Sequence, residues 1–321
     1  MIRALALTLT LAPAGMAGAF ELGFPVDCTL GETCFIQNYF DHDTGPGMQD
    51  FTCGPLTYDG HDGTDIRLPT TAWMEAGVAI HPVAPGRVKG LRDGMPDIAK
   101  DDPAAPALNG RDCGNGVVID HGGGWETQYC HMKFGTVTVK AGDQVGRKTV
   151  LGKIGLSGNT VFPHLHLAVR KNGVEVDPFT PDAPTTCSAA PDPTTDLWED
   201  PIPYDSFGFL DAGITDAAPD YAAVKAGLPP RLEFAPDTPA LVIWAFFFGA
   251  KAGDVLTLRL KGPEETVVDQ AVTIDRTQAQ AMQFTGRKLR GSWPLGDYVG
   301  TLILTRDGVA LEQRTLSATV K

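Results

Sequence analysis

Basic residues are scarce in this chain of 321 residues. It has 26 Lys and Arg against 39 Asp and Glu, which gives a formal net charge of −13. Binding to nucleic acid or to an anionic membrane needs a basic surface, so this charge argues against both kinds of partner. Beyond the N-terminus, no apolar run approaches the length of a membrane-spanning helix, so no membrane span is expected.

Several short signatures are also absent. No C-x-x-C pair indicates a structural zinc site, and no G-x-S-x-G indicates a serine hydrolase. The segment 41–45 is similar to the start of a calcium loop, but Thr52 stands where the twelfth position needs Glu. An Asp/Gly turn is therefore the favoured interpretation of that segment.

The N-terminus has the pattern of a cleaved secretory signal. A positive start with Arg3 precedes an apolar run over residues 4–11, and Ala17-Gly18-Ala19 form a small-residue cleavage site before Phe20. Residues 1–19 are thus predicted to be a signal peptide, and the protein to be periplasmic or secreted. In an oxidising compartment disulfides are expected for its six Cys, at positions 28, 34, 53, 113, 130 and 187.

Cysteine and proline indicate the domain organisation. All Cys precede residue 190, and seven Pro fall within residues 178–203, where they disfavour both helices and sheet hydrogen bonding. We expect a first domain with an N-terminal extension over residues 20–190 and a Pro-rich linker over 191–204. Residues 205–321 would form the second domain.

The predicted fold class is mostly β. Residues 116–120 and 126–130 flank a triple-Gly turn and predict a hairpin. In the second domain, residues 241–248 predict a strand buried between two sheets, residues 255–260 alternate, and a short helix is expected within 211–226. Short strands at this spacing predict an antiparallel β-sandwich of immunoglobulin-like type.

Chemistry-bearing residues gather in three short segments that contain His61 and Asp65, His131, and His164 with His166. Side chains two apart on a strand share a face, so His164 and His166 would lie side by side. With another His and a carboxylate they would form a zinc site, although spacing alone leaves open which of the five groups bind the metal. The remaining His, at positions 42, 81 and 121, are predicted to be surface or turn residues.

These segments resemble the LytM/lysostaphin-type zinc endopeptidases, peptidase family M23. The resemblance runs in order from about residue 60 to 178 and includes H-D-G-T-D at 61–65, the hairpin at 116–131 and P-H-L-H at 163–166. It implies an antiparallel β-sheet groove of the duplicated-hybrid-motif kind. It implies Zn²⁺ held by His61, Asp65 and His166 with a fourth position for water, and His131 and His164 acting in catalysis.

The chain departs from the family pattern in three places. Cys130 replaces a Gly that commonly precedes the catalytic His, and we expect a disulfide between Cys130 and Cys113. Val161-Phe162 and Leu167-Ala168 replace a polar pair and an aromatic-acidic pair, which alters the groove walls. All five site residues are retained, unlike in relatives that have lost them and regulate other hydrolases.

The resemblance implies an exported zinc metalloendopeptidase that cleaves peptide bonds of bacterial peptidoglycan, in stem-peptide cross-links. One alternative is a non-catalytic protein that binds the cell wall or regulates other enzymes through the same groove; another is a peptidase acting on proteins. The sequence leaves open the roles of the second domain, of His131 against His164, and of residues 20–60, which cover the groove in one interpretation. It names no protein partner.

Overall fold

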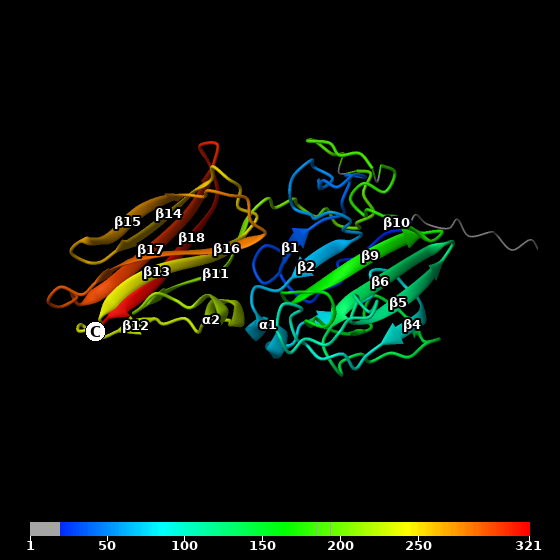
Figure 1. Ribbon diagram of the computed structural model, residues 1–321, viewed down its shortest axis with the longest axis horizontal. Helices are drawn as coiled ribbons and strands as arrows, with labels where there is room; N and C mark the ends of the chain where they lie inside the picture. The colour runs from blue at the N-terminus through cyan, green and yellow to red at the C-terminus, as the bar shows by residue number, and fades with distance from the viewer. Residues whose placement is uncertain (1–19, 184, 193) are drawn as a thin grey trace, which may run out of the picture.

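The computed structural model describes residues 20–183, 185–192 and 194–321 (Figure 1). The predicted signal peptide, residues 1–19, lies outside the described residues. Within them the chain forms eighteen strands and two short helices, α1 (Thr71–Ala76) and α2 (Tyr221–Ala226), so the prediction of a mostly β fold is confirmed. No helix of this part is long and apolar enough to cross a bilayer.

The first half of the chain is built on one antiparallel sheet with the strand order β1-β2-β9-β6-β5-β4-β7, and β10 pairs with β9. A two-stranded ribbon of β3 and β8 accompanies it. The bounds are β1 (Phe35–Asn38), β2 (Thr64–Arg67), β3 (Ala79–Ile80), β4 (Gly86–Arg92), β5 (Asn115–Gly122), β6 (Trp125–Met132), β7 (Gln144–Val145), β8 (Gly152–Lys153), β9 (His164–Lys171) and β10 (Val174–Val176). The predicted hairpin is the β5–β6 pair.

Alternation along β9 explains which face of this sheet carries chemistry. Leu165, Leu167 and Val169 are fully buried in the core beneath the sheet. Because neighbouring side chains point to opposite faces, His164 and His166 share the other face, as the H-x-H spacing predicts.

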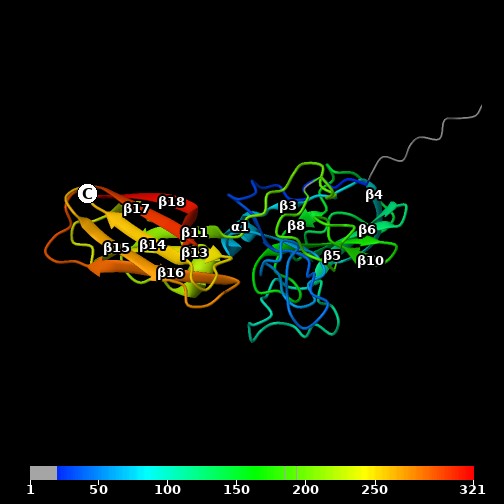
Figure 2. The ribbon, with the colours of Figure 1, turned by 90° about the horizontal axis from the view of Figure 1, so that it is seen from above.

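The second half is a sandwich of two sheets, with strand orders β11-β13-β16 and β12-β18-β17-β14-β15 (Figures 1 and 2). The bounds are β11 (Gly208–Thr215), β12 (Glu233–Phe234), β13 (Ala240–Phe248), β14 (Val255–Lys261), β15 (Thr266–Thr273), β16 (Gln280–Lys288), β17 (Gly296–Arg306) and β18 (Val309–Val320). At the start of β17 the Tyr298 hydroxyl donates to the Pro294 carbonyl at 3.0 Å, the tyrosine corner of immunoglobulin-like sandwiches. The helix expected within 211–226 is confined to α2, because residues 211–215 belong to β11.

Strand β13 is buried on both faces, which explains its uninterrupted apolar sequence. Leu241, Ile243 and Phe247 pack in the core of the sandwich. Trp244, Phe246 and Phe248 pack in the core of the first half, where Phe248 meets Phe35 edge-on with ring centroids 5.6 Å apart. The run 241–248 is therefore a buried strand as predicted, but its second face is covered by the first half of the chain.

Three disulfides use all six Cys. They join Cys28 to Cys34, Cys53 to Cys187 and Cys113 to Cys130. The bond expected between Cys113 and Cys130 is confirmed. The bond from Cys53 to Cys187 connects the N-terminal extension to the segment that follows β10.

Candidate active site

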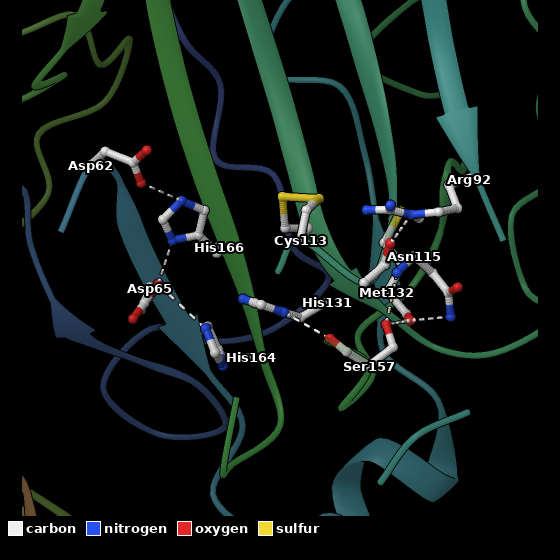
Figure 3. Close-up of a disulfide and its surroundings, with 12 residues drawn as sticks. Asp62, Asp65, Arg92, Cys113, Asn115, His131, Met132, Ser157, His164 and His166 are labelled. Carbon is white, nitrogen blue, oxygen red and sulfur yellow. Dashed lines mark hydrogen bonds and ion pairs between the residues drawn. A yellow bond between two sulfur atoms is a disulfide. The ribbon is translucent and has the colours of Figure 1, made fainter. Parts of the chain in front are cut away.

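Two neighbouring strands supply most of the site. β2 and β9 run antiparallel in a register that sets Asp65 opposite His166 and Arg67 opposite His164. The next strand, β6, sets Cys130 opposite His166 and so brings His131 to the same region of the sheet. His61 comes from the loop before β2. The fold thus gathers all five residues singled out in the sequence, and Figure 3 shows four of them, Asp65, His131, His164 and His166.

Three donor atoms converge at the centre of the site. His61 Nε2 lies 3.1 Å from Asp65 Oδ1 and 3.2 Å from His166 Nδ1. His166 Nδ1 lies 2.9 Å from the same carboxylate oxygen. One ligand atom from each residue falls within 4.8 Å of the others, and all three residues are buried or nearly so. The second oxygen of Asp65 accepts a hydrogen bond from Asn38 Nδ2 at 2.8 Å.

Backbone carbonyls orient three of the imidazoles. Nδ1 lies 2.6 Å from the Tyr39 carbonyl in His61, 2.8 Å from the Ser157 carbonyl in His131 and 3.0 Å from the Phe162 carbonyl in His164. A carbonyl only accepts, so each Nδ1 carries the hydrogen, which leaves the Nε2 lone pair directed into the site.

His166 is oriented the opposite way round. Its Nε2 lies 3.2 Å from Asp62 Oδ1, while its Nδ1 faces Asp65 and His61 (Figure 3). Asp62 therefore accepts from Nε2, and Nδ1 is the ring nitrogen that faces the cluster. Such a carboxylate behind a ligating imidazole fixes the ring and increases its basicity.

His131 and His164 lie beside this cluster. Their ring centroids are 4.6 Å apart, and His164 Nε2 lies 3.3 Å from Asp65 Oδ1. His131 occupies a β-bulge: Cys130 and His131 together face the single residue Gly116, and His131 has a φ of 60°. A bulge with one residue in the left-handed region redirects a side chain, which here aims His131 at the site.

The Cys113–Cys130 disulfide holds that bulge. It joins the residue before His131 to the chain that enters β5, and the His131 amide donates to the Cys113 carbonyl at 2.8 Å. A left-handed conformation is strained for a residue with a side chain and persists only where its surroundings enforce it. The disulfide and this hydrogen bond are two such restraints (Figure 3).

Charges and burial set the protonation states. Burial favours the neutral form of Asp65, but His61 and His164 hold its pKa well below the usual range, so it stays ionised. Burial, with His164 and His166 nearby, lowers the pKa of His131 well below 6.5, so His131 is neutral. Burial opposes protonation of His166, yet its hydrogen bonds to Asp62 and Asp65 raise its pKa to about 9.

A groove of about 180 Å³ opens over these residues. Among the described residues 20–60, Tyr58 lines the groove. The idea that this segment covers the groove therefore stays a prediction. The lining residues are Tyr58, Asp62, Asp112, Cys113, Gln128, Cys130, His131, Asn159, His166, Ala168 and Arg170.

The three His outside the cluster behave differently from one another. His42 was predicted to be a surface or turn residue, and this is wrong: it is buried, and its Nε2 lies 2.7 Å from Asp177 Oδ2. Its partner is far along the sequence, so no local pattern reveals the pair. His81 and His121 are partly exposed and hydrogen-bond to the Thr149 and Pro85 carbonyls.

Sequence reasoning missed Asn38 and Asp62. A signal existed for Asp62, which directly follows His61 in the H-D-G-T-D segment and is a natural acceptor for an imidazole. None existed for Asn38, since it reaches Asp65 only through the β1–β2 pairing.

The sequence profile of peptidase family M23 matches residues 59–178, the span that contains all five site residues. Residues 59–178 belong to peptidase family M23. Two curated relatives are a DD-carboxypeptidase/endopeptidase, Mpg, of Neisseria meningitidis and a peptidoglycan DD-endopeptidase, ShyA, of Vibrio cholerae. They are 38% identical over 72 residues and 28% identical over 128 residues, which cover 22% and 40% of this chain.

These matches cover only 16% of Mpg and 24% of ShyA. Among solved structures, the catalytic domain of the prophage-encoded M23 protein EnpA from Enterococcus faecalis is 25% identical at a TM-score of 0.34. That match covers 51% of this chain and 98% of EnpA's. A zinc-containing peptidase from Vibrio cholerae is 21% identical at a TM-score of 0.29, covering 48% of this chain and 41% of that one.

Proposed function

We propose that this protein is an exported zinc-dependent endopeptidase that hydrolyses peptide bonds in peptidoglycan. The observation that carries the proposal is the cluster of His61, Asp65 and His166 with His131 and His164 beside it. Two imidazole nitrogens and one carboxylate oxygen are the donor set of a catalytic zinc site.

The arrangement of the donors fits zinc. His61 presents a lone pair on Nε2, because its Nδ1 donates to the Tyr39 carbonyl. With a pKa of about 9 His166 is protonated in the metal-free site, so binding of zinc through its Nδ1 would release that proton while Asp62 still accepts from Nε2. Asp65 is ionised and oriented by Asn38. When bound, zinc supplies a Lewis acid that polarises a carbonyl and favours deprotonation of a water.

His131 and His164 would handle the protons. Nδ1 of each ring donates to a carbonyl, so Nε2 is the atom that would accept a proton from an attacking water and return it to the leaving amine. Neutrality of His131 at physiological pH follows from its lowered pKa. The two rings lie close enough to serve the same scissile bond from neighbouring positions.

The substrate class rests on the relatives. The curated names of Mpg and ShyA specify endopeptidases, and ShyA's specifies peptidoglycan. By analogy with these two relatives, we expect this protein to cleave stem-peptide cross-links. The predicted signal peptide and the three disulfides support a periplasmic or secreted location.

The test combines metal analysis with cleavage of soluble cross-linked muropeptides. We expect bound zinc and new products from the wild type. His61→Ala should lose metal and activity, and His131→Ala should keep metal while losing at least about 100-fold in rate, as for a general acid–base group. His121→Ala is the matched control, since His121 lies outside the cluster.

Two outcomes would contradict the proposal: metal-free wild type, or unchanged activity in both site variants. Binding of muropeptides without products would favour the non-catalytic alternative. Cleavage of a casein-like protein in place of muropeptides would favour a peptidase acting on proteins.

A further inference from the structure

Arg67 is a buried cation without an acidic partner. It is 1% exposed, on the same strand as Asp65. Its guanidinium donates to neutral acceptors: the Gln37 side chain, Gln280 Oε1 at 3.1 Å and the Leu68 and Pro69 carbonyls at 3.2 Å and 3.4 Å. Within the described residues it forms no ion pair.

Burial of a charge normally requires an opposite charge, because removing an ion from water costs several kcal/mol. Arg306, whose side chain is 14% exposed, follows that rule and pairs with Asp254 at 2.8 Å. Arg67 departs from this rule, so an anion that binds beside it would balance its charge.

A cavity of about 180 Å³ lies against Arg67 at the junction of the two halves. Pro69, Leu156 and Phe162 line it from the first half, and Lys225, Phe246 and Gln280 from the second. The lining contains two cations and no carboxylate, in a chain where acidic residues outnumber basic ones. Lys225 also forms no ion pair in the described part of the protein.

The other residues that line the cavity indicate which kind of anion would fit. Phe162 and Phe246 flank the guanidinium, with ring centroids 4.7 Å and 5.7 Å from its central carbon. The cavity of about 180 Å³ is large enough for a small organic group. A carboxylate on a small apolar group fits this combination, because one N–H of the guanidinium, on Nη2, is left without an acceptor among the residues described and the Lys225 ammonium supplies a second cationic donor.

We propose that the cavity between the two halves binds the free C-terminal carboxylate of a short apolar peptide, with Arg67 and Lys225 as its cationic partners. The site is separate from the His cluster but adjacent to it, since the Phe162 ring that contacts Arg67 also lies 4.5 Å from the His164 ring. Binding here goes beyond the proposed peptidase activity and needs no metal.

The test is calorimetric titration of the full chain, stripped of metal, with N-acetyl-alanyl-alanine of either configuration. The same peptides as C-terminal amides are the matched neutral ligands. We expect at least one acid to bind, and its amide to bind at least about 10-fold more weakly, since loss of a charge-assisted hydrogen bond has about that effect.

Protein variants complete the test. Lys225→Gln should weaken binding of the acid several-fold, and Arg67→Gln should abolish it in protein whose melting temperature shows that it is folded. Lys288→Gln, which changes an exposed lysine of the same sandwich, should leave binding unchanged. The proposal is overturned if neither acid binds, if acid and amide bind equally, or if Lys225→Gln has no effect. Because no metal is present, loss of peptidase activity does not bear on it.

Discussion

The three disulfides should contribute unequally to the free energy of unfolding, and the disulfide that closes the longest loop should contribute most. A cross-link restricts the unfolded chain more when it joins residues farther apart. The sequence separations are 134 for Cys53–Cys187, 17 for Cys113–Cys130 and 6 for Cys28–Cys34. The chain-entropy relation converts these at 25 °C to about 5, about 3 and about 2 kcal/mol.

The assay is thermal unfolding of three double Cys→Ser variants, one for each bond, without reductant. At about 2–4 °C per kcal/mol, removal of Cys53–Cys187 should lower the melting temperature by about 10–20 °C, and removal of Cys28–Cys34 by about 4–8 °C. The Cys113–Cys130 variant should fall between them. The reasoning is refuted if the Cys53–Cys187 variant melts at or above the Cys28–Cys34 variant.

Three further predictions concern single residues. Asp62→Asn should weaken zinc affinity by about 10–100-fold in a chelator competition, because the acceptor behind His166 loses its charge. Gly63→Ala should reduce stability by about 1–3 kcal/mol in denaturant titrations, since its Cβ would lie 2.8 Å from the His166 ring; Gly90→Ala, with nothing within 4 Å, is the control. Burial raises the pKa of Asp211 from 3.8 to about 6, so this carboxyl destabilises the fold increasingly as pH rises from 4 through 6. Asp211→Asn should therefore raise the melting temperature at pH 7.5 but not at pH 4, and an equal gain at both would contradict the shift.

The sequence predicts the site well where local geometry decides it. The shared face of His164 and His166 follows from strand alternation alone, and the pairing of Cys113 with Cys130 follows from the two arms of a predicted hairpin. Those arms are recognisable because Gly122–Gly124 mark the turn between them.

Contacts between distant segments explain the failures. The Ala and Asp content of residues 211–226 predicts a short helix, but residues 211–215 form a strand because each of them pairs with a residue of β13, for example Ile214 with Ile243. His42 has a turn-like sequence context, yet it is buried because Asp177 meets it from across the chain. Neither pairing leaves a periodic signal in the sequence.

The two-sided burial of β13 has a consequence for engineering. Trp244, Phe246 and Phe248 complete the hydrophobic core of the first half, so a truncation after β10 would leave Phe35 and its neighbours facing water. The segment that matches peptidase family M23 is thus a poor module for transplantation into fusions. Unless its exposed face is redesigned with polar side chains, the excised segment should aggregate. The two halves should unfold as one unit, because they share this core.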